Sequence, residues 1–198
     1  MAVDFYDNLI VYAGNTVGDI LKSGDGGIHW QVIKRFDSKI FKIMIDPSDS
    51  RIIYVATSSK GIFKTIDSGA NWLDINDGLK PYSGAFEYRS LIFNPSESNS
   101  LILAAKYGLI KTNDGGQTWE ALQLITPPAT TDIFAVAVSP ENSKEMYYTT
   151  STTFYKTIDG GQNWITKRLP TLAIPSSIII NPNYPGVMYM GITSSPRR

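Results

Sequence analysis

Short apolar runs alternate with polar turn segments along the whole chain. The first run of each unit is continuous, and its copies are "KIMI" ending at Ile45, "SLIF" ending at Phe93, "FAVAV" ending at Val138 and "SSIII" ending at Ile180. A continuous run of this length predicts a strand that is buried on both faces. A second run follows an Asp/Asn/Ser-Pro turn, as in "IIYVA" at Ile52 or "LILAA" at Leu101. Helical periodicity is essentially missing, so the pattern predicts an all-β chain.

Each unit continues with two more strands joined by a motif rich in glycine. The third strand is "GIFKT" from Gly61 or "GLIKT" from Gly108, and the fourth is predicted to start at a tryptophan, as in "WLDI" or "WEAL". The copies of the joining motif are "KSGDGGIHW" from Lys22, "KTIDSGANW" from Lys64, "KTNDGGQTW" from Lys111 and "KTIDGGQNW" from Lys156. Their aspartates are 42, 47 and 45 residues apart, a period typical of propeller blades.

A second anchor marks each unit 20 or 21 residues before the motif aspartate, at Asp46, Asn94 and Ser139. It also occurs at Asp4 and Asn181, so the chain has five anchors and four motifs. We therefore expect an all-β β-propeller of four-stranded antiparallel blades, with about four and a half blades and an incomplete ring. The expected blades, within one domain or fragment, are approximately 1–36, 37–82, 83–127 and 128–170, with a half blade at 171–198. A β-solenoid is the alternative, although its coils are usually shorter.

An incomplete ring exposes apolar blade faces, which normally mark an interface. The sequence thus predicts either a fragment of a longer propeller protein or self-association through open blade edges.

The pattern Ser/Thr-x-Asp-x-Gly-x-x-Trp resembles the Asp box, also called the BNR repeat. This repeat occurs in sialidases, xyloglucan-cleaving glycoside hydrolases, sortilin-type receptors and a photosystem II assembly factor. The upstream element "DP....IIYVAT" is most similar to the xyloglucanase and sortilin branches. Position seven of the box, often Thr in the family, is His29, Asn71, Thr118 and Asn163 here. The resemblance implies a propeller whose parent protein is secreted or periplasmic. The compartment of this chain stays open, because "MAVDFYDNLI" lacks the basic and apolar regions of a signal peptide.

We interpret the box residues as structural. Glycine accepts the positive φ of the hairpin, aspartate and the hydroxyl satisfy backbone amides, and tryptophan packs between strands or blades. A calcium loop needs several carboxylates, whereas each box offers one. No box has the Gly-Lys-Ser/Thr ending of a phosphate loop. The residues concerned are Ser23, Asp25, Gly27, Trp30, Thr65, Asp67, Gly69, Trp72, Thr112, Asp114, Gly116, Trp119, Thr157, Asp159, Gly161 and Trp164. The lysine that opens each motif is expected to lie on an exposed strand.

The composition argues against several kinds of partner and bound metal. Lys and Arg number 18 and Asp and Glu number 18, so no net field attracts nucleic acid or an anionic membrane. The chain has no cysteine and a single histidine, His29, which excludes a multi-histidine or thiolate metal site. No apolar run approaches the roughly 20 residues that span a bilayer. We expect no cofactor and no metal.

The connections between blades lie on the face opposite the boxes, and we look for a site there. They comprise residues 34–40, 76–89, 123–132 and 166–176. The second is the longest, and its aromatic and charged residues suit a sugar or protein surface. The candidate ligand-binding residues are Tyr82, Phe86, Glu87, Tyr88, Arg89 and Asp132. The leading hypothesis is a noncatalytic module that binds a glycan or protein ligand through this loop face. The alternative for the loop is that its aromatics pack over the blade.

The alternative function is a fragment of a secreted glycoside hydrolase, similar to a xyloglucanase. Such an enzyme needs two carboxylates across a cleft, and the candidates are Asp37, Asp77, Glu87 and Asp132. A sialidase is less well supported, although Arg35, Arg89 and Arg168 lie on the same side. Glu87 and Tyr88 are adjacent and point to opposite faces of a strand, and the family's Phe/Tyr-Arg-Ile-Pro element is missing.

Overall fold

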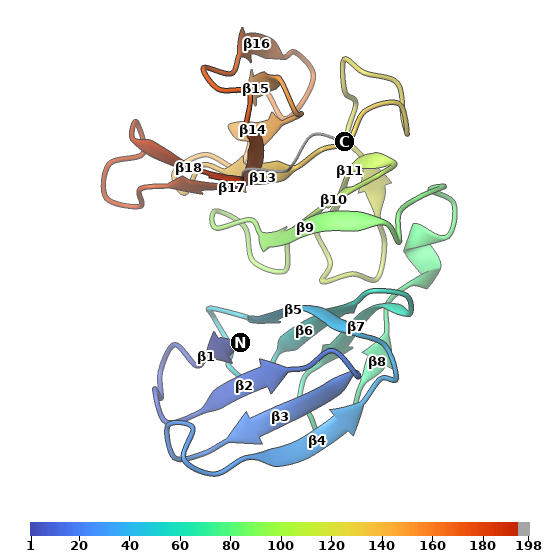
Figure 1. The fold of residues 1–198 in the computed structure, drawn as a ribbon, viewed down its shortest axis with the longest axis vertical. Coiled ribbons are helices and arrows are strands. Elements are labelled where there is room, and N and C mark those ends of the chain that lie inside the picture. The colour runs from blue at the N-terminus through green and yellow to red at the C-terminus, as the bar shows by residue number, and fades with distance from the viewer. Residues whose placement is uncertain (194–198) are drawn as a thin grey trace. The chain divides into compact units, whose positions relative to one another are not determined.

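The computed structural model describes residues 1–193, which form strands and one short 3-10 helix (Figure 1). The chain divides into two compact units, Met1–Gly78 and the part from Leu79 on. Strands of the first unit are β1 (Ala2–Val3), β2 (Val11–Gly14), β3 (Asp19–Ser23), β4 (Gln31–Arg35), β5 (Ile40–Ile45), β6 (Ile53–Thr57), β7 (Gly61–Thr65) and β8 (Leu73–Asp74). Those of the second are β9 (Tyr88–Phe93), β10 (Leu101–Ala105), β11 (Gly108–Thr112), β12 (Glu120–Ala121), β13 (Ala135–Val138), β14 (Met146–Thr149), β15 (Thr153–Thr157), β16 (Ile165–Arg168), β17 (Ile174–Ile180) and β18 (Met188–Thr193). The helix η1 spans Asp77–Leu79.

The first unit consists of two four-stranded antiparallel sheets, each with its strands in chain order. A hydrophobic cluster joins them, in which Tyr12, Ile20 and Phe36 of the first repeat meet residues of β5 and β6. The second sheet supplies Ile53 and Val55, both fully buried. The two sheets of this unit therefore share one hydrophobic core.

The second unit holds two more four-stranded antiparallel sheets, β9–β12 and β13–β16, and a two-stranded sheet of β17 and β18. One cluster packs β10 and β11 against β13 to β15, through Ile102, Leu109, Val136 and Tyr148 among others. Another packs the opposite face of the β13–β16 sheet against Ile178 of β17. The repeated four-stranded sheets confirm the predicted fold class of antiparallel propeller blades.

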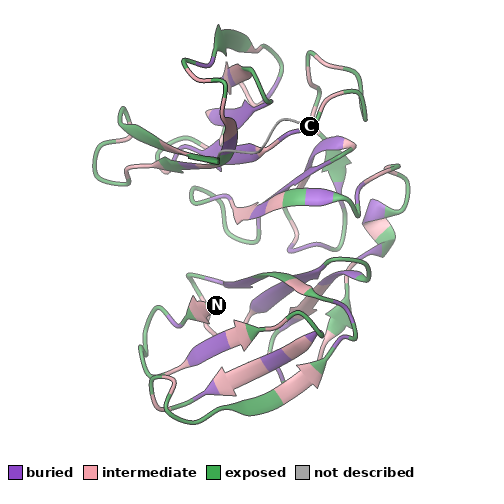
Figure 2. Ribbon diagram, in the orientation of Figure 1, coloured by how far each residue is buried: buried purple, intermediate pink, exposed green. Residues whose placement is uncertain are grey.

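In the β5–β8 and β9–β12 sheets the second strand is the most buried, whereas the first strand, predicted to be buried on both faces, is partly exposed. All residues of β6, β10 and β14 are buried, and so are those of the first strand β13, as its apolar run predicted (Figure 2). In contrast, β5 exposes Phe41 and Lys42, and β17 alternates. The second strand has a hydrogen-bonded neighbour on each side, whereas the first lies at a sheet edge. A central strand therefore exposes less of its surface to solvent than an edge strand does.

The fourth strand of each blade begins one residue after the tryptophan, and not at the tryptophan as predicted. The starts are Gln31, Leu73, Glu120 and Ile165. The turn of the motif includes the tryptophan, so hydrogen-bonded pairing with the third strand starts at the next residue.

The anchors are turns closed by a polar side chain. Asp46 Oδ1 accepts the backbone N–H of Ser48 at 2.8 Å, and Asn94 Oδ1 accepts that of Ser96 at 3.1 Å. Asn181 Oδ1 likewise accepts the N–H of Asn183 at 2.9 Å. This local bond favours the tight reversal between the first and second strands.

Candidate functional site

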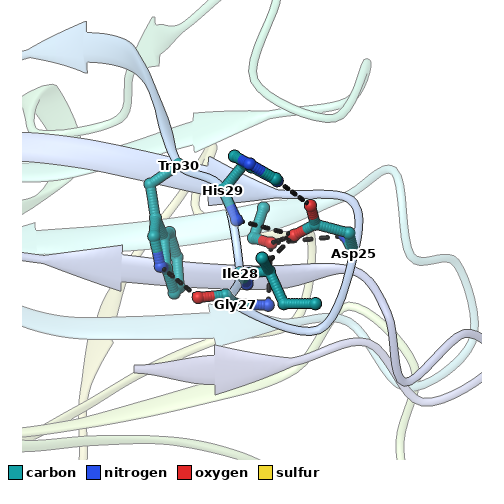
Figure 3. A network of polar contacts seen from close by, with 6 residues as sticks. Asp25, Gly27, Ile28, His29 and Trp30 are labelled. Carbon is teal, nitrogen blue, oxygen red and sulfur yellow. Dashed lines mark hydrogen bonds and ion pairs between the residues drawn. The ribbon is translucent and has the colours of Figure 1, made fainter.

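The first box shows how the motif satisfies its own backbone (Figure 3). Asp25 Oδ1 accepts the N–H groups of Ile28 at 3.1 Å and His29 at 2.9 Å. The Ser23 hydroxyl donates to the same oxygen at 2.8 Å and accepts the N–H of Gly27 at 2.9 Å. The second carboxylate oxygen, Oδ2, faces His29 Nδ1 at 2.6 Å. Both oxygens of the aspartate are thus engaged inside the turn.

The other boxes repeat this network with a different residue at position seven. Asn71 Nδ2 donates to Asp67 Oδ2 at 2.8 Å, and Asn163 Nδ2 to Asp159 Oδ2 at 2.8 Å. In the third box the Thr118 hydroxyl donates to an oxygen of Asp114 at 2.5 Å. Position seven therefore requires a short side chain that can donate, which explains why His, Asn and Thr all occur there.

These bonds hold the box carboxylates in the charged form. Hydrogen bonds from the Asn71 backbone, the Thr65 hydroxyl and the Asn71 side chain lower the pKa of Asp67 to about 2. Bonds from the Asn163 backbone and side chain likewise lower the pKa of Asp159 to about 2. Within residues 1–193, no group of three or more His, Asp or Glu side chains could hold a metal ion.

The glycine at position five of each box adopts a left-handed conformation. Its φ is 94° at Gly27, 96° at Gly69, 95° at Gly116 and 94° at Gly161. A Cβ at Gly69 would lie 2.6 Å from Ile33 Cδ1, so the backbone also approaches the preceding sheet closely. Only glycine combines this φ with that approach.

The tryptophans bury their rings to different degrees. Trp119 is 7% exposed, whereas Trp30 is 38% exposed. The indole N–H of Trp72 donates to Gly69 O at 3.0 Å, within its own box. That of Trp164 donates to Gln123 O at 2.8 Å, in the connection that precedes its blade.

The lysines that open the boxes are half-buried against aromatic or acidic partners. The Nζ atoms of Lys22 and Lys64 stand 5.5 and 5.2 Å from the ring centroids of Tyr12 and Tyr54. Lys111 Nζ pairs with Glu97 at 3.0 Å. The lysine stems thus cover apolar surface beside the second strand.

The long connection before β9 uses much of its aromatic surface internally. The Tyr82 hydroxyl donates to Trp119 O at 2.9 Å, and its ring meets Tyr107 edge-on with centroids 4.9 Å apart. Tyr88 is 6% exposed on β9, so its ring does not face solvent. Phe86 is 36% exposed.

The charged candidates of this region form exposed ion pairs. Glu87 Oε1 lies 3.2 Å from Lys106 Nζ. Arg89 and Asp132, from segments far apart in the sequence, approach to 3.9 Å. Neither pair presents two carboxylates to one another.

A hollow of about 400 Å³ lies in the second unit. It is lined by Tyr107, Gly108 and residues 121–128. Residues 123–132 belong to a connection that was predicted to carry the site, whereas Tyr107 was not among the predicted residues. The sequence feature that could have indicated Tyr107 is its position in the turn between a second and a third strand. Such turns are expected on the same face as the connections between blades.

Comparisons with known proteins agree with this fold. A xyloglucanase, Xgh74A of Acetivibrio thermocellus, is 28% identical over 54% of this chain and 16% of its own length. Vacuolar protein sorting/targeting protein 10 of Fusarium vanettenii is 27% identical over 48% of this chain and 6% of its own length. The chain thus spans a small part of these curated relatives.

Solved structures show the same architecture at low identity. The GH74 enzyme of Niastella koreensis superimposes with a TM-score of 0.75 and 17% identity, over 96% of this chain and 34% of its own. YCF48 from Cyanidioschyzon merolae superimposes with a TM-score of 0.70 and 18% identity, over 96% of this chain and 62% of its own. A model described as sortilin, neurotensin receptor 3, matches residues 18–122, which is more than half of the sequence. The chain therefore belongs to the Sortilin-Vps10 family.

Proposed function

We propose that this chain is a noncatalytic Asp-box propeller module that binds a protein ligand through the hollow lined by Tyr107, Gly108 and residues 121–128. The observation that carries the proposal is the hollow itself, whose volume of about 400 Å³ falls in the range of ligand pockets. Pockets of this kind bind an apolar side chain and fix its backbone with a few polar groups.

The walls of the hollow are held in place before any ligand arrives. On one side, the Ala129 N–H donates to Tyr107 O at 3.0 Å. On the other, the Trp164 indole donates to Gln123 O at 2.8 Å. Because the loop is fastened at both points, little conformational entropy would be lost on binding.

The lining favours a peptide over a sugar. It is mainly aliphatic, with Leu122, Leu124, Ile125 and two prolines, while Tyr107 already packs against Tyr82. A pyranose ring needs a flat aromatic face bordered by polar groups. An extended peptide needs an apolar hollow for one or two of its side chains.

The lining also disfavours catalysis. Among the described residues that line the hollow, none is acidic. Glycosidases need two facing carboxylates, and here Glu87 and Asp132 are each paired with a cation.

A propeller of similar fold supports a peptide ligand by analogy. YCF48 has been solved bound to a D1 peptide, and that structure superimposes with a TM-score of 0.67 at 15% identity. This likeness concerns the fold alone, so the proposal rests on the hollow of this chain.

A library of displayed peptides panned on the purified protein tests the proposal. We expect enriched peptides to share an apolar residue and to lose at least tenfold in affinity against Ile125→Asp. Ile125 is 56% exposed, so the substitution should leave the fold intact. The matched control is Ile158→Asp in the fourth box, where Ile158 is 60% exposed. Enriched peptides that bind Ile125→Asp as well as the original protein would contradict the proposal.

The second candidate is part of a glycoside hydrolase similar to a xyloglucanase, which the 28% identity to Xgh74A favours. Incubation with xyloglucan separates the two candidates. Release of oligosaccharides, lost on Asp132→Asn and Glu87→Gln, would favour the hydrolase. We expect no turnover by this chain.

We also propose that the parent protein acts outside the cytoplasm. The names of two relatives, a xyloglucanase and a vacuolar sorting protein, support this location. Fractionation of the source cells, with an antibody against this chain, would test it.

A further inference from the structure

Tyr148 of β14 carries a buried hydroxyl group without a hydrogen-bond partner. The residue is 0% exposed, and its hydroxyl makes no hydrogen bond of normal geometry within residues 1–193. The neighbouring Tyr147 differs, because its hydroxyl donates to Glu145 Oε1 at 2.5 Å. A buried hydroxyl without a partner costs free energy, since it gives up its bonds to water and gains none. Such a group in a native fold therefore needs an explanation.

The architecture of the blade does not require this hydroxyl. In each second strand, the position concerned follows the residue that pairs with the box lysine. The other three blades place an aliphatic residue there, namely Ala13, Val55 and Leu103. A blade therefore forms without a polar group at the position of Tyr148.

Tyr148 lies against the wall of the hollow. Leu122 and Leu124 line the hollow, and they also pack against the hydrophobic cluster that contains Tyr148. Burial raises the pKa of Tyr148, and the side chain of Thr126, another lining residue, opposes that rise. The two side chains are thus close, although their geometry is not that of a hydrogen bond. The Tyr148 hydroxyl therefore lies directly behind Thr126.

The ring of Tyr148 is held firmly by other aromatic rings. Tyr155 stacks on it, with centroids 4.2 Å apart and 6° between the ring planes. Trp164 contacts it edge-on at 4.8 Å, and the Trp164 indole is fixed by its bond to Gln123 O in the wall of the hollow. The position of the hydroxyl is therefore set before a ligand binds, which lowers the entropic cost of using it.

Taking the hollow as the peptide site proposed above, we propose that Tyr148 determines its specificity by donating a hydrogen bond to the side-chain carbonyl of a ligand glutamine. Thr126 stands between the hollow and the hydroxyl, so its side chain turns aside as the amide enters. The main chain of the peptide stays above the lining, and a side chain is needed to reach the hydroxyl.

A neutral acceptor suits this hydroxyl better than a charged or an apolar group. Among the described residues that line the hollow none is charged, so a carboxylate would be buried there without a cation. An apolar side chain would leave the hydroxyl unsatisfied. Glutamine carries its carbonyl beyond two methylene groups, which suit the aliphatic lining. In an extended peptide, an apolar residue two positions away points to the same side and can fill the rest of the hollow.

Three displayed peptide libraries that differ only in a fixed central residue, glutamine, glutamate or methionine, test the proposal. On the original protein we expect glutamine peptides to be enriched about tenfold over the other two kinds. On Tyr148→Phe this preference should disappear. The matched control is Tyr147→Phe, which removes a hydroxyl from a ring that packs in a different cluster, with Ile178 of β17. The control should keep the preference for glutamine.

Thermal unfolding separates this role of Tyr148 from a structural one. Tyr148→Phe should leave the melting temperature within about 2 °C of the original or raise it, because the hydroxyl has no bond to lose. Tyr147→Phe should lower the melting temperature, since it loses the bond to Glu145. An equal fall for the two variants would overturn the proposal, because the Tyr148 hydroxyl would then already be satisfied within the protein.

The libraries also distinguish this proposal from the proposed function. Suppose that peptides require Ile125 for binding but prefer glutamine equally on Tyr148→Phe, or show no such preference on the original protein. The role of Tyr148 would then be wrong, and the hollow would remain the binding site. If no library yields a peptide whose binding is weakened by Ile125→Asp, both proposals are wrong.

Discussion

His29 Nδ1 lies 2.6 Å from Asp25 Oδ2, where the other boxes place an asparagine or threonine donor. The same residue's backbone N–H donates to the other oxygen, Oδ1, at 2.9 Å. Position seven thus clamps the carboxylate with two donors, one from the main chain and one from the side chain. The chemistry of the donor matters there, and the identity of the residue does not.

Replacement of His29 tests this interpretation. His29→Asn keeps a donor, as in the second and fourth boxes, and should leave the melting temperature within about 2 °C of the original. His29→Leu removes the donor and should lower the melting temperature further than His29→Asn does. Differential scanning calorimetry of both variants at neutral pH measures the effect. Equal melting temperatures for the two variants would show that the side-chain donor contributes nothing.

The box carboxylates should make the protein sensitive to acid. The pKa of Asp159 is lowered from an ordinary value of 3.8 to about 2 by hydrogen bonds from Asn163 and Thr157. Because the folded state binds its proton less readily than the unfolded state, the stabilisation is complete above about pH 4. It is lost as the pH falls through about 2. Urea unfolding across this interval should show a smaller loss of stability for Asp159→Asn than for the original protein.

The same acid series has an internal control. Asp7 is an aspartate outside the boxes, exposed in the first turn. Asp7→Asn removes one carboxylate outside the boxes, so comparison with it corrects the Asp159→Asn result for the loss of one negative charge. An acid profile unchanged by Asp159→Asn would assign the sensitivity to other carboxylates.

The buried and exposed box tryptophans should differ in their contribution to stability. Trp119 is 7% exposed, so Trp119→Ala should cost about 3 to 5 kcal/mol of unfolding free energy. Trp30 is 38% exposed, so Trp30→Ala should cost about 2 kcal/mol or less. Chemical denaturation followed by circular dichroism compares the two. A larger loss for Trp30→Ala would contradict this order.

Gly61 should tolerate no side chain. Its φ is 83°, and a Cβ there would lie 2.0 Å from Asn76 Oδ1. Asn76 Oδ1 accepts the Ile62 N–H at 2.7 Å, so the amide cannot move without breaking that bond. Gly61→Ala should therefore cost about 2 kcal/mol or more. Gly24→Ala is the control, since a Cβ at Gly24 meets nothing within 4 Å.

The repeat in the sequence predicts the blades, but the apolar runs do not predict that the first strands β5 and β9 are partly exposed. The four box motifs and five anchors give the order and length of the strands directly. The apolar run ending at Ile45 has the letters of a central strand, yet β5 lies at a sheet edge. The amino-acid sequence of a segment gives its hydrophobicity, whereas its burial depends also on which strands pair with it. The fourth strands begin one residue late for a similar reason, because the turn continues through the tryptophan.

The site was predicted less fully, because it depends on contacts between distant segments. Tyr82 was expected as a ligand platform, but it bonds to Trp119 O and packs against Tyr107. Tyr88 alternates inward on β9, which its neighbours in the loop did not reveal. Arg89 and Asp132 are 43 residues apart in the sequence and meet only in the fold. Tyr107 was not predicted as a site residue, because a single aromatic residue in a turn forms no pattern that indicates binding.

Two of the box tryptophans contact the blade that precedes their own in the sequence. The Trp72 ring meets Phe36, just after β4, edge-on at 5.3 Å, and Trp164 reaches back to Gln123 in the same way. In these two cases the tryptophan of a blade contacts the preceding blade of its own unit. Deletion of the box from either of these blades would therefore remove its tryptophan contact with the preceding blade. A duplicated blade would carry its own tryptophan, and with it the means of attachment to the blade before.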